Sequence, residues 1–476
     1  MLKRKIEKHL LNWKNNRKQA LLVTGARQIG KTFSLKHFAE EHFKNFVYLN
    51  FADYPSLVAS YAELKNPDDL LDKLSLFDGA HLVPGRTVVF FDEIQLLYNY
   101  REKLKEKAGL PLLSLDLLTA MKPLVIDGRY RFMLSGSLLG IEVNDVILSP
   151  VGYMDTIRMF PLDFEEFLWA KGVGDSAIEK LRESFKNQTP VEQETNKQML
   201  ELFRQYVLVG GMPEAVEVFL KTHNFESVKI VHEQIKAIYL NDMTRYVEEK
   251  DKKLKIREVY EEIPSEVNSK NKRFVSSHVA DPGYLRKKGL SDEFLWLTNA
   301  AVALPIYNVT EPVLPLTLAS ERKTLKLFLN DVGLLGTALF DTGVRQKLLD
   351  GKKEINFGAP YENAVAQELY AHGFAEKSFY YNSKKHGEVD FLVEYQGEPC
   401  PIEIKSGKPD LMNTYNHVAL NNLLKLYDIK QAFLFGETNV IKENEKITLY
   451  PLYMVSFLNG KTIYSSDGPG FEQDKG

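Results

Sequence analysis

The stretch that decides the fold is Ala20-Leu-Leu-Val-Thr24 followed by Gly25-Ala26-Arg27-Gln28-Ile29-Gly30-Lys31-Thr32. The apolar run predicts a buried strand, and the eight residues after it match the pattern GxxxxGK[ST] in full. A helical pattern then continues through Phe38. Together these features favour a phosphate-binding loop, because such a loop turns its backbone N–H groups and a helix N-terminus toward the anion. A chance glycine turn is the alternative, and the flanking strand and helix argue against it.

The chemistry of this loop predicts a role for its residues. Gly25 and Gly30 let the backbone curl, Lys31 reaches the β- and γ-phosphates, and the Thr32 hydroxyl is a ligand for Mg²⁺. ATP and Mg²⁺ are therefore the cofactors that we expect. The predicted nucleotide contacts are Gly25, Ala26, Arg27, Gln28, Ile29, Gly30, Lys31, Thr32 and Phe33.

A second apolar run, Arg86-Thr-Val-Val-Phe-Phe, ends in the acid pair Asp92-Glu93. Asp92 is predicted to hold Mg²⁺ through water, and Glu93 to act as the catalytic base that polarises the attacking water. An acid pair at this position favours hydrolysis of a nucleoside triphosphate over phosphorylation of a small acceptor. The alternative is a strand with a charged exit, and a neighbouring phosphate-binding loop makes that alternative weak.

A third apolar run ends in Ser135-Gly136-Ser137. Ser135 is predicted to hydrogen-bond the γ-phosphate or the attacking water, although a Ser-Gly-Ser turn on its own is equally well explained as a loop. The candidates for an arginine that stabilises the transition state are Arg129, Arg131 and Arg158. The sequence does not choose among these three arginines, and a surface salt bridge is the simpler role for each one.

Composition limits the alternatives. At roughly 150 residues per domain, the 476 residues predict about three domains. A hydrophobic fraction of 44% and a net charge of -3 exclude a wholly disordered chain. Cys400 is the one cysteine, which excludes a disulfide framework and a cysteine-built zinc site. No apolar run approaches the roughly 18 residues of a membrane span. The basic N-terminus also lacks the apolar core of a signal peptide, so we expect a cytoplasmic protein that does not enter a membrane.

These motifs resemble the AAA-type ATPase domain of a large prokaryotic family, whose members join it to a C-terminal domain of unknown function. The resemblance rests on the phosphate-binding loop, residues 48–53 (YLNFAD), FFDEIQ around Asp92 and FMLSGS around Ser135. It continues in three further blocks, PLDFEEF at 161–167, GGMPEA at 210–215 and NDVGLL at 330–335. The resemblance implies an AAA-type core over residues 1–161.

The middle of the chain is predicted to be helical. Residues 162–250 are expected to form a helical lid, in which 210–213 is either a hinge or a helix-capping turn. The resemblance implies a winged-helix module over 251–345. Residues 268–290 carry six basic side chains, Lys270, Lys272, Arg273, Arg286, Lys287 and Lys288, against the single acid Asp281. This stretch either neutralises DNA phosphates or serves as a solubilising or protein-binding surface.

Residues 346–476 resemble the core of PD-(D/E)xK nucleases. Glu362 lies in a predicted helix, Asp390 at a strand, and Glu403-Ile-Lys405 on the next strand. Asp390, Glu403 and Glu362 are predicted metal ligands, because Mg²⁺ prefers carboxylate oxygens. Lys405 shares a strand face with Glu403 and is the predicted catalytic lysine, which lowers the pKa of metal-bound water. An amphipathic edge strand would produce the same pattern without any chemistry.

The fold class predicted is therefore α/β. It consists of a P-loop AAA-type ATPase core, a helical lid, a winged-helix module and a restriction-endonuclease-like α/β domain. The first functional hypothesis is an ATPase that controls a domain cutting or binding DNA. The second is an ATP-dependent signalling switch whose C-terminal domains bind protein partners, or a second copy of the chain, without catalysis. A structural ATP-binding module with negligible turnover is the third, and Glu93 argues against it.

Overall fold

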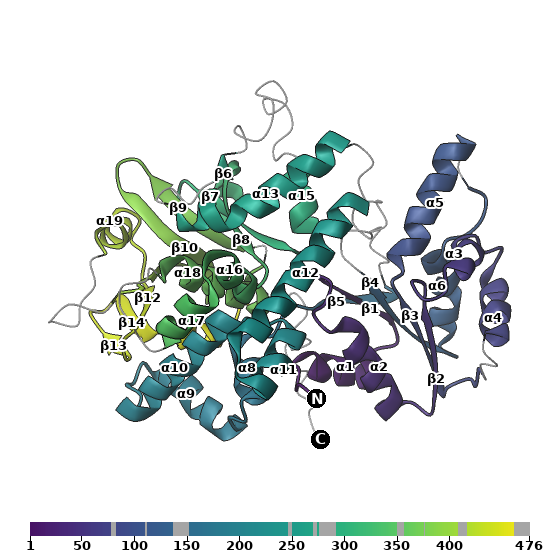
Figure 1. Ribbon diagram of the computed structural model, residues 1–476, viewed down its shortest axis with the longest axis horizontal. Coiled ribbons are helices and arrows are strands. Elements are labelled where there is room, and N and C mark those ends of the chain that lie inside the picture. The colour runs from purple at the N-terminus through teal and green to yellow at the C-terminus, as the bar shows by residue number, and fades with distance from the viewer. Residues whose placement is uncertain are drawn as a thin grey trace, which may run out of the picture. The chain divides into compact units, whose positions relative to one another are not determined.

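The computed structural model describes residues 1–77, 82–109, 112–136, 152–245, 250–269, 274–275, 292–349, 357–375, 377–407 and 417–460. The chain divides into two compact units (Figure 1). The N-terminal unit comprises Lys3–Phe160 with Trp296–Val302. The C-terminal unit comprises Pro161–Leu295 and Ala303–Gly476 with the first two residues. The six basic side chains of 268–290 and Ser137 lie outside the described residues.

The N-terminal unit is built on a five-stranded sheet with the order β2-β3-β4-β1-β5. Every neighbouring pair in this sheet is parallel, so the carboxyl ends of all its strands meet at one edge. The predicted strands at 20–24 and 87–92 are present and fully buried. The strands are β1 (Ala20–Thr24), β2 (Asn45–Asn50), β3 (Thr87–Asp92), β4 (Arg131–Gly136) and β5 (Met154–Arg158).

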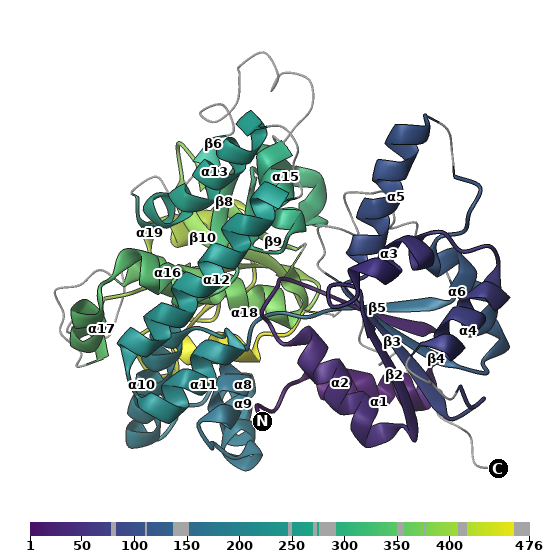
Figure 2. The same cartoon turned by 45° about the vertical axis from the view of Figure 1, so that its right-hand side comes forward.

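Helices cover both faces of this sheet (Figure 2). One face packs its Leu, Val and Phe side chains against α3 to α6, in a single apolar core. The other face packs against α2, whose buried residues include Leu35 and Phe38. The helices are α1 (Ile6–Asn16), α2 (Lys31–His42), α3 (Pro55–Ala62), α4 (Pro67–Leu76), α5 (Gln95–Ala108) and α6 (Leu117–Asp127).

The C-terminal unit begins with a run of helices, as the periodicity of 162–250 predicts. These are α8 (Phe164–Ala170), α9 (Asp175–Asn187), α10 (Gln193–Val209), α11 (Pro213–Thr222), α12 (Phe225–Arg245) and α13 (Lys250–Asn268). Farther along the chain are α15 (Asp292–Asn299), α16 (Val332–Leu339), α17 (Thr342–Leu349), α18 (Gly358–Leu369) and α19 (Val418–Leu426), with the short turns η1 (Leu316–Ala319), η2 (Tyr370–Phe374) and η3 (Leu452–Phe457). None of the helices within the described ranges is long and apolar enough to cross a membrane.

A nine-stranded mixed sheet with the order β13-β14-β12-β11-β10-β9-β7-β8-β6 forms the centre of this unit. Its strands are β6 (Phe274–Val275), β7 (Ala303–Val309), β8 (Ser320–Leu329), β9 (Ser378–Ser383), β10 (Gly387–Tyr395), β11 (Glu398–Ile404), β12 (Ala432–Gly436), β13 (Ile441–Lys442) and β14 (Ile447–Pro451). Because β7 pairs with β9, strands from 251–345 and from 346–476 share one continuous sheet.

The second half of this sheet runs α18-β9-β10-β11-α19-β12 along the chain. Strands β9, β10 and β11 form an antiparallel meander, and β12 is parallel to β11. Leu420 and Leu423 of α19 join a buried apolar cluster on one face. On the other, Phe433 packs against Phe185 of α9, which also contacts Phe457 of η3. The pairing of β10 with β9 shifts by one residue between Val389 and Leu392, so Asp390 lies in a β-bulge.

Three sequence blocks, 161–167, 210–215 and 330–335, meet in the C-terminal unit. Asp331 caps α16 by accepting the Leu334 N–H, and its Oδ2 accepts the Gly211 N–H over 2.6 Å. A Cβ on Gly211 would lie 2.0 Å from the Leu162 carbonyl oxygen, so a larger residue does not fit. The turn at 210–213 thus ends α10 and begins α11, which is the helix-capping alternative.

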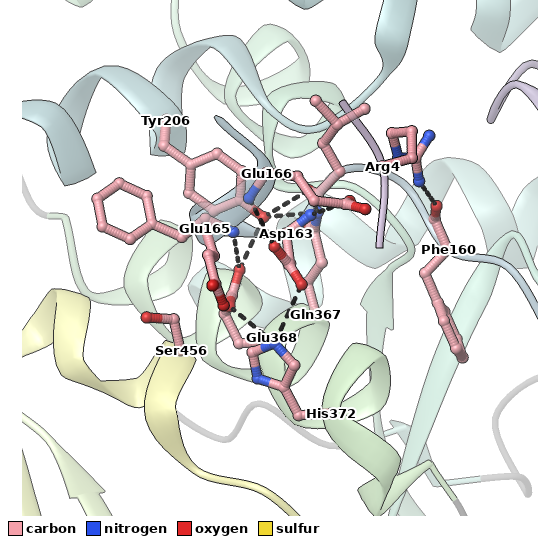
Figure 3. Close-up of polar contacts among 12 residues, drawn as sticks. Arg4, Phe160, Asp163, Glu165, Glu166, Tyr206, Gln367, Glu368, His372 and Ser456 are labelled. Atoms are coloured by element: carbon pink, nitrogen blue, oxygen red, sulfur yellow. Dashed lines mark hydrogen bonds and ion pairs between the residues drawn. The ribbon is translucent and has the colours of Figure 1, made fainter. Parts of the chain in front are cut away.

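Polar side chains of the block 161–167 and Tyr206 of α10 form a buried network with residues of α18 and η2 (Figure 3). Glu368 Oε1 accepts hydrogen bonds from the Phe164 N–H over 2.8 Å and from the Tyr206 hydroxyl over 2.9 Å. Asp163 begins α8 in a capping box, and its Oδ2 lies 3.1 Å from Nε2 of His372. A buried carboxylate is stable only when such donors satisfy it, so this network fixes the register of α8 against α18.

Candidate functional site

The loop at 25–32 wraps tightly at the end of β1 in the N-terminal unit. Gly25 has φ +142° and Gly30 has φ +91°, conformations that residues with a Cβ rarely adopt. A Cβ on Gly25 would lie 2.3 Å from the Met159 carbonyl oxygen. The Arg4 guanidinium, which sequence reasoning missed, donates to the carbonyl oxygens of Ile29 and Phe160 over 2.9 and 2.8 Å. The loop is therefore held by the Arg4 side chain and lies closely against the backbone at Met159.

Lys31 begins α2 and points back into the loop. Its Nζ donates to the carbonyl oxygens of Gly25 over 3.0 Å and of Ala26 over 2.7 Å. Burial lowers the pKa of Lys31 to about 8, an effect that the nearby Glu93 and Asp92 oppose. A buried ammonium held by weak carbonyl acceptors is poised to exchange them for an anion, which fits phosphate at this position.

Asp92 is the centre of the hydrogen-bond network at the end of β3. Its Oδ2 accepts the Thr32 hydroxyl over 2.6 Å and the Tyr48 hydroxyl over 3.1 Å. Its Oδ1 accepts the Ser135 hydroxyl and the Glu93 N–H. Burial and the Asp92 charge raise the pKa of the Tyr48 phenol. Carboxylate and hydroxyl oxygens are the donor set that Mg²⁺ prefers, so Thr32 and Asp92 fit the predicted ion.

Tyr48 was missed as a site residue, although it opens the block 48–53. No pattern in the sequence marks it, because its place near Asp92 follows from the parallel pairing of β2 with β3, in which Tyr48 lies opposite Phe90. Of the other predicted contacts, Gln28 has φ +65° within the loop. The Phe33 side chain is 59% exposed and stacks on His37 instead of packing into the loop.

Glu93 follows Asp92 with φ +57°, in the left-handed region. Gln95 donates its side-chain amide to Glu93 Oε2, and the Arg27 guanidinium lies 3.6 Å from the same oxygen. The carboxylate of Glu93 is thus held by one group from the loop and one from α5. Gln95 was not predicted, because an amide after an acid pair carries no recognisable pattern.

The three candidate arginines are engaged within the N-terminal unit. Arg131 lies 4.3 Å above the Trp13 ring and donates to the Trp13 carbonyl oxygen. Arg129 pairs with Asp127, and Arg158 lies 5.3 Å from the centre of the Phe160 ring. On α1, Ile6, Leu10 and Trp13 are buried, whereas Leu11 is 39% exposed.

Comparison with known proteins bears on this unit. Residues 17–168 match a family described as an AAA domain. This match and the loop geometry support an AAA-type P-loop ATPase domain, as the sequence motifs predict. Residues 200–346 match a domain of unknown function (DUF8612), and residues 357–455 match another (DUF4143). The comparison with curated proteins finds no match.

Several solved structures are similar to the chain at low identity. A Walker-type ATPase of Pyrococcus abyssi is 14% identical with a TM-score of 0.37, covering 71% of this chain and 96% of its own. A structure of PCH-2 from C. elegans is 16% identical with a TM-score of 0.24, covering 49% and 64%. A structure that describes katanin self-assembly is 14% identical with a TM-score of 0.22, covering 36% and 55%. These TM-scores are too low to establish a shared fold.

The structure brings Asp390, Glu403 and Lys405 together in the C-terminal unit. Asp390 Oδ2 accepts the Ile404 N–H over 2.8 Å, and Lys405 Nζ pairs with Glu403 Oε1. Burial raises the pKa of Glu403, while Lys405 opposes that shift. The Ile404 backbone therefore contributes a hydrogen-bond donor to Asp390.

Lys326 and Glu388, two charged residues that sequence reasoning missed, join this cluster. Lys326 of β8 places its Nζ 2.8 Å from Glu388 Oε1 and 3.9 Å from Asp390 Oδ1. Asn382 of β9 donates to the other oxygen of Glu388 over 2.8 Å. Lys326 alternates with Leu325 and Leu327, a pattern that suggests a solvent-facing lysine, so no sequence signal marks it.

The predicted metal set fits this cluster less well. Glu362 is buried on α18, and no group of three or more His, Cys, Asp or Glu side chains within the described ranges is arranged to hold a metal ion. The two carboxylates Asp390 and Glu403 remain as predicted ligands, and Lys405 as the predicted lysine. Cys400 is buried in β11, and burial raises the pKa of its thiol, which fits a packing role.

Proposed function

We propose that this chain is a Mg²⁺-dependent ATPase that controls a C-terminal unit acting on or binding DNA. The observation that carries the ATPase part is the acid pair at the end of β3, where Asp92 accepts hydrogen bonds from Thr32 and Ser135. A P-loop alone requires only nucleotide binding. A carboxylate base next to a magnesium-type donor set is the additional feature that hydrolysis needs.

Nucleotide binding, in this proposal, begins at Lys31. Its ammonium leaves the carbonyl oxygens of Gly25 and Ala26 and pairs with the β- and γ-phosphates, while loop N–H groups bind the remaining oxygens. Mg²⁺ supplies positive charge that the leaving phosphates need. The Thr32 hydroxyl and the Asp92 carboxylate would hold this ion.

Hydrolysis then depends on Glu93. The carboxylate accepts a proton from the attacking water, and Ser135 orients that water or the γ-phosphate. Arg27 and Gln95 hold the carboxylate by its Oε2, so the base has a defined position before nucleotide arrives. This arrangement is consistent with turnover and disfavours a purely structural role for the nucleotide.

The DNA part rests on the C-terminal unit. The order α18-β9-β10-β11-α19-β12, with an antiparallel meander and a parallel fourth strand, supports a PD-(D/E)xK nuclease-like core. Asp390, Glu403 and Lys405 converge on neighbouring strands of it. The basic stretch 268–290 supports a winged-helix module that neutralises DNA phosphates.

One observation favours the second candidate, an ATP-dependent signalling switch. Glu403 is paired with Lys405, and Glu388 with Lys326, so the chain supplies its own counter-charges at the proposed metal site. Under this reading the C-terminal unit is a nuclease-shaped scaffold that binds protein partners. The two candidates differ in one measurable property, which is cleavage of nucleic acid.

The decisive experiment is a cleavage assay on duplex DNA, single-stranded DNA and RNA with Mg²⁺ or Mn²⁺, with and without ATP. The full-length chain is compared with Lys405→Ala and with Glu93→Gln. Cleavage that is lost in Lys405→Ala supports the nuclease-like reading. The signalling switch is supported instead if ATP is hydrolysed, no nucleic acid is cleaved, and duplex DNA does not bind at any salt concentration.

A further inference from the structure

Lys326 is the most deeply buried charged group near the C-terminal carboxylates. Its side chain is 1% exposed, yet it lies on β8, which β7 and β9 separate from β10 in the sheet. The side chain nevertheless contacts β10, as Phe328 of the same strand contacts Phe391, and its Nζ lies 5.0 Å from the centre of the Tyr380 ring. Keeping an ammonium in such a position is costly unless anions stabilise it.

The anions that stabilise it are Glu388 and Asp390. Lys326 Nζ lies 2.8 Å from Glu388 Oε1 and 3.9 Å from Asp390 Oδ1, and these two side chains are 24% and 18% exposed. Both acids belong to β10 on either side of Val389, so they share one face of that strand. The β-bulge begins at this point and aims Asp390 toward the Ile404 N–H.

Charge is nearly balanced in this cluster. Three carboxylates, Glu388, Asp390 and Glu403, face two ammonium groups, Lys326 and Lys405. Lys405 belongs to the sequence motif, whereas Lys326 comes from a part of the chain outside it. A divalent cation that binds Asp390 and Glu403 must approach with Lys326 already present, so the two cations repel each other.

We propose that Lys326 is a positioning residue that holds Glu388 and Asp390 and sets the affinity of the Asp390–Glu403 site for divalent cations. The proposal rests on the nuclease-like reading of this unit, because it assumes that Asp390 and Glu403 take up a metal. The proposal predicts a change in metal affinity that is opposite in direction to the change caused by damage to the fold. Removing a buried cation from the site strengthens metal binding, whereas damage to the fold weakens it.

The experiment is a titration of the whole chain with Mn²⁺, in which calorimetry and water-proton relaxation measure metal binding. All proteins carry Lys31→Ala, so that the P-loop site holds no nucleotide-bound metal. Lys326→Met keeps the length of the apolar stem. Lys326→Gln, which retains a hydrogen-bond donor for Glu388, is the second variant in case the methionine variant does not fold. Lys326→Arg keeps the charge. The matched control is Lys430→Met, which removes an exposed lysine that pairs with Glu398 of β11.

We expect Lys326→Met and Lys326→Gln to bind Mn²⁺ about tenfold more tightly than the background, and Lys326→Arg and Lys430→Met to match it. Adding Asp390→Asn to Lys326→Met must abolish the gain. If the background binds Mn²⁺ in an Asp390-dependent way but the folded Lys326 variants bind it equally or more weakly, the proposed role of Lys326 is wrong while the metal site stands. If neither the background nor the variants show an Asp390-dependent site, the metal site of the proposed function fails as well.

Discussion

The Thr32 hydroxyl donates a 2.6 Å hydrogen bond to Oδ2 of Asp92. This contact joins the first turn of α2 to the end of β3, two elements that are far apart in the sequence. Both side chains are predicted to hold Mg²⁺, and the same carboxylate also accepts the Ser135 hydroxyl at Oδ1 and the Tyr48 hydroxyl at Oδ2. The two groups that we propose to hold Mg²⁺ therefore already lie together, which would lower the cost of ordering them on binding.

Lys31→Ala is expected to abolish nucleotide binding. The variant removes the one ammonium in the loop that faces the phosphates, and the carbonyl oxygens that Lys31 contacts add no positive charge. The measurement is calorimetric titration with ATP and Mg²⁺. Lys44→Ala, which removes an exposed lysine after α2, is the control and should bind normally. ATP affinity that survives Lys31→Ala would contradict the P-loop assignment.

Nucleotide binding should also take up a proton at high pH. Burial lowers the pKa of Lys31 to about 8, so at pH 9 the side chain is mostly neutral before binding. The phosphates favour the charged form and raise this pKa, so binding at pH 9 recharges Lys31 from solvent, whereas at pH 7 it is already protonated. Titrations in two buffers of different ionisation enthalpy measure the uptake. An equal uptake at both pH values would exclude Lys31 as its source.

Glu93→Gln is expected to bind ATP normally and to lose hydrolysis by about 100-fold or more. The amide keeps the shape and the contact with Gln95 but cannot accept a proton from water. Steady-state phosphate release and ATP titration separate the two effects. Glu102→Gln on α5, a partly exposed residue that pairs with Lys105, is the matched control. Turnover within a few-fold of the unsubstituted chain would show that another group is the base.

Sequence reasoning succeeded where the chemistry is local. The loop 25–32 and the pair Asp92-Glu93 carry their own strand context, so both the strands and the edge at which they meet could be predicted. To place Tyr48 near Asp92, one must know that β2 lies next to β3, and no sequence motif contains the order of the strands. To place Lys326 near Glu388, one must know the order of four strands and the curvature of the sheet. Its alternation with Leu325 and Leu327 predicts a solvent-facing side chain instead.

The middle of the chain illustrates the same limit. Its helices follow from periodicity, but the pairing of β7 with β9 depends on contacts between residues far apart in the sequence. The blocks 210–215 and 330–335 were recognised as motifs without any indication that Asp331 accepts the Gly211 N–H. Close approach of two backbones selects glycine, yet the sequence does not identify which backbone approaches.

Asp331→Asn should destabilise the C-terminal unit by about 1–3 kcal/mol. The buried carboxylate accepts N–H groups on both oxygens, from Gly211 over 2.6 Å and from Leu334 over 3.1 Å. An asparagine keeps one acceptor oxygen for one backbone N–H. Its amide NH₂ group faces the other backbone N–H, so these two facing donors have no acceptor. Because burial raises the pKa of Asp331 to about 6, the comparison is made at pH 8, where the carboxylate is ionised.

The matched control for this change is Asp341→Asn. Asp341 also accepts a backbone N–H, that of Val344 over 2.8 Å, but at an exposed position where water replaces a lost acceptor. Calorimetry gives the change in the unfolding midpoint, and amide hydrogen exchange at Gly211 reports the local contact. Faster exchange at Gly211 in Asp331→Asn, with Asp341→Asn unchanged, is the expected result. Unaltered exchange and an unaltered midpoint would mean that the packing of Gly211 against Leu162 alone holds the turn in place.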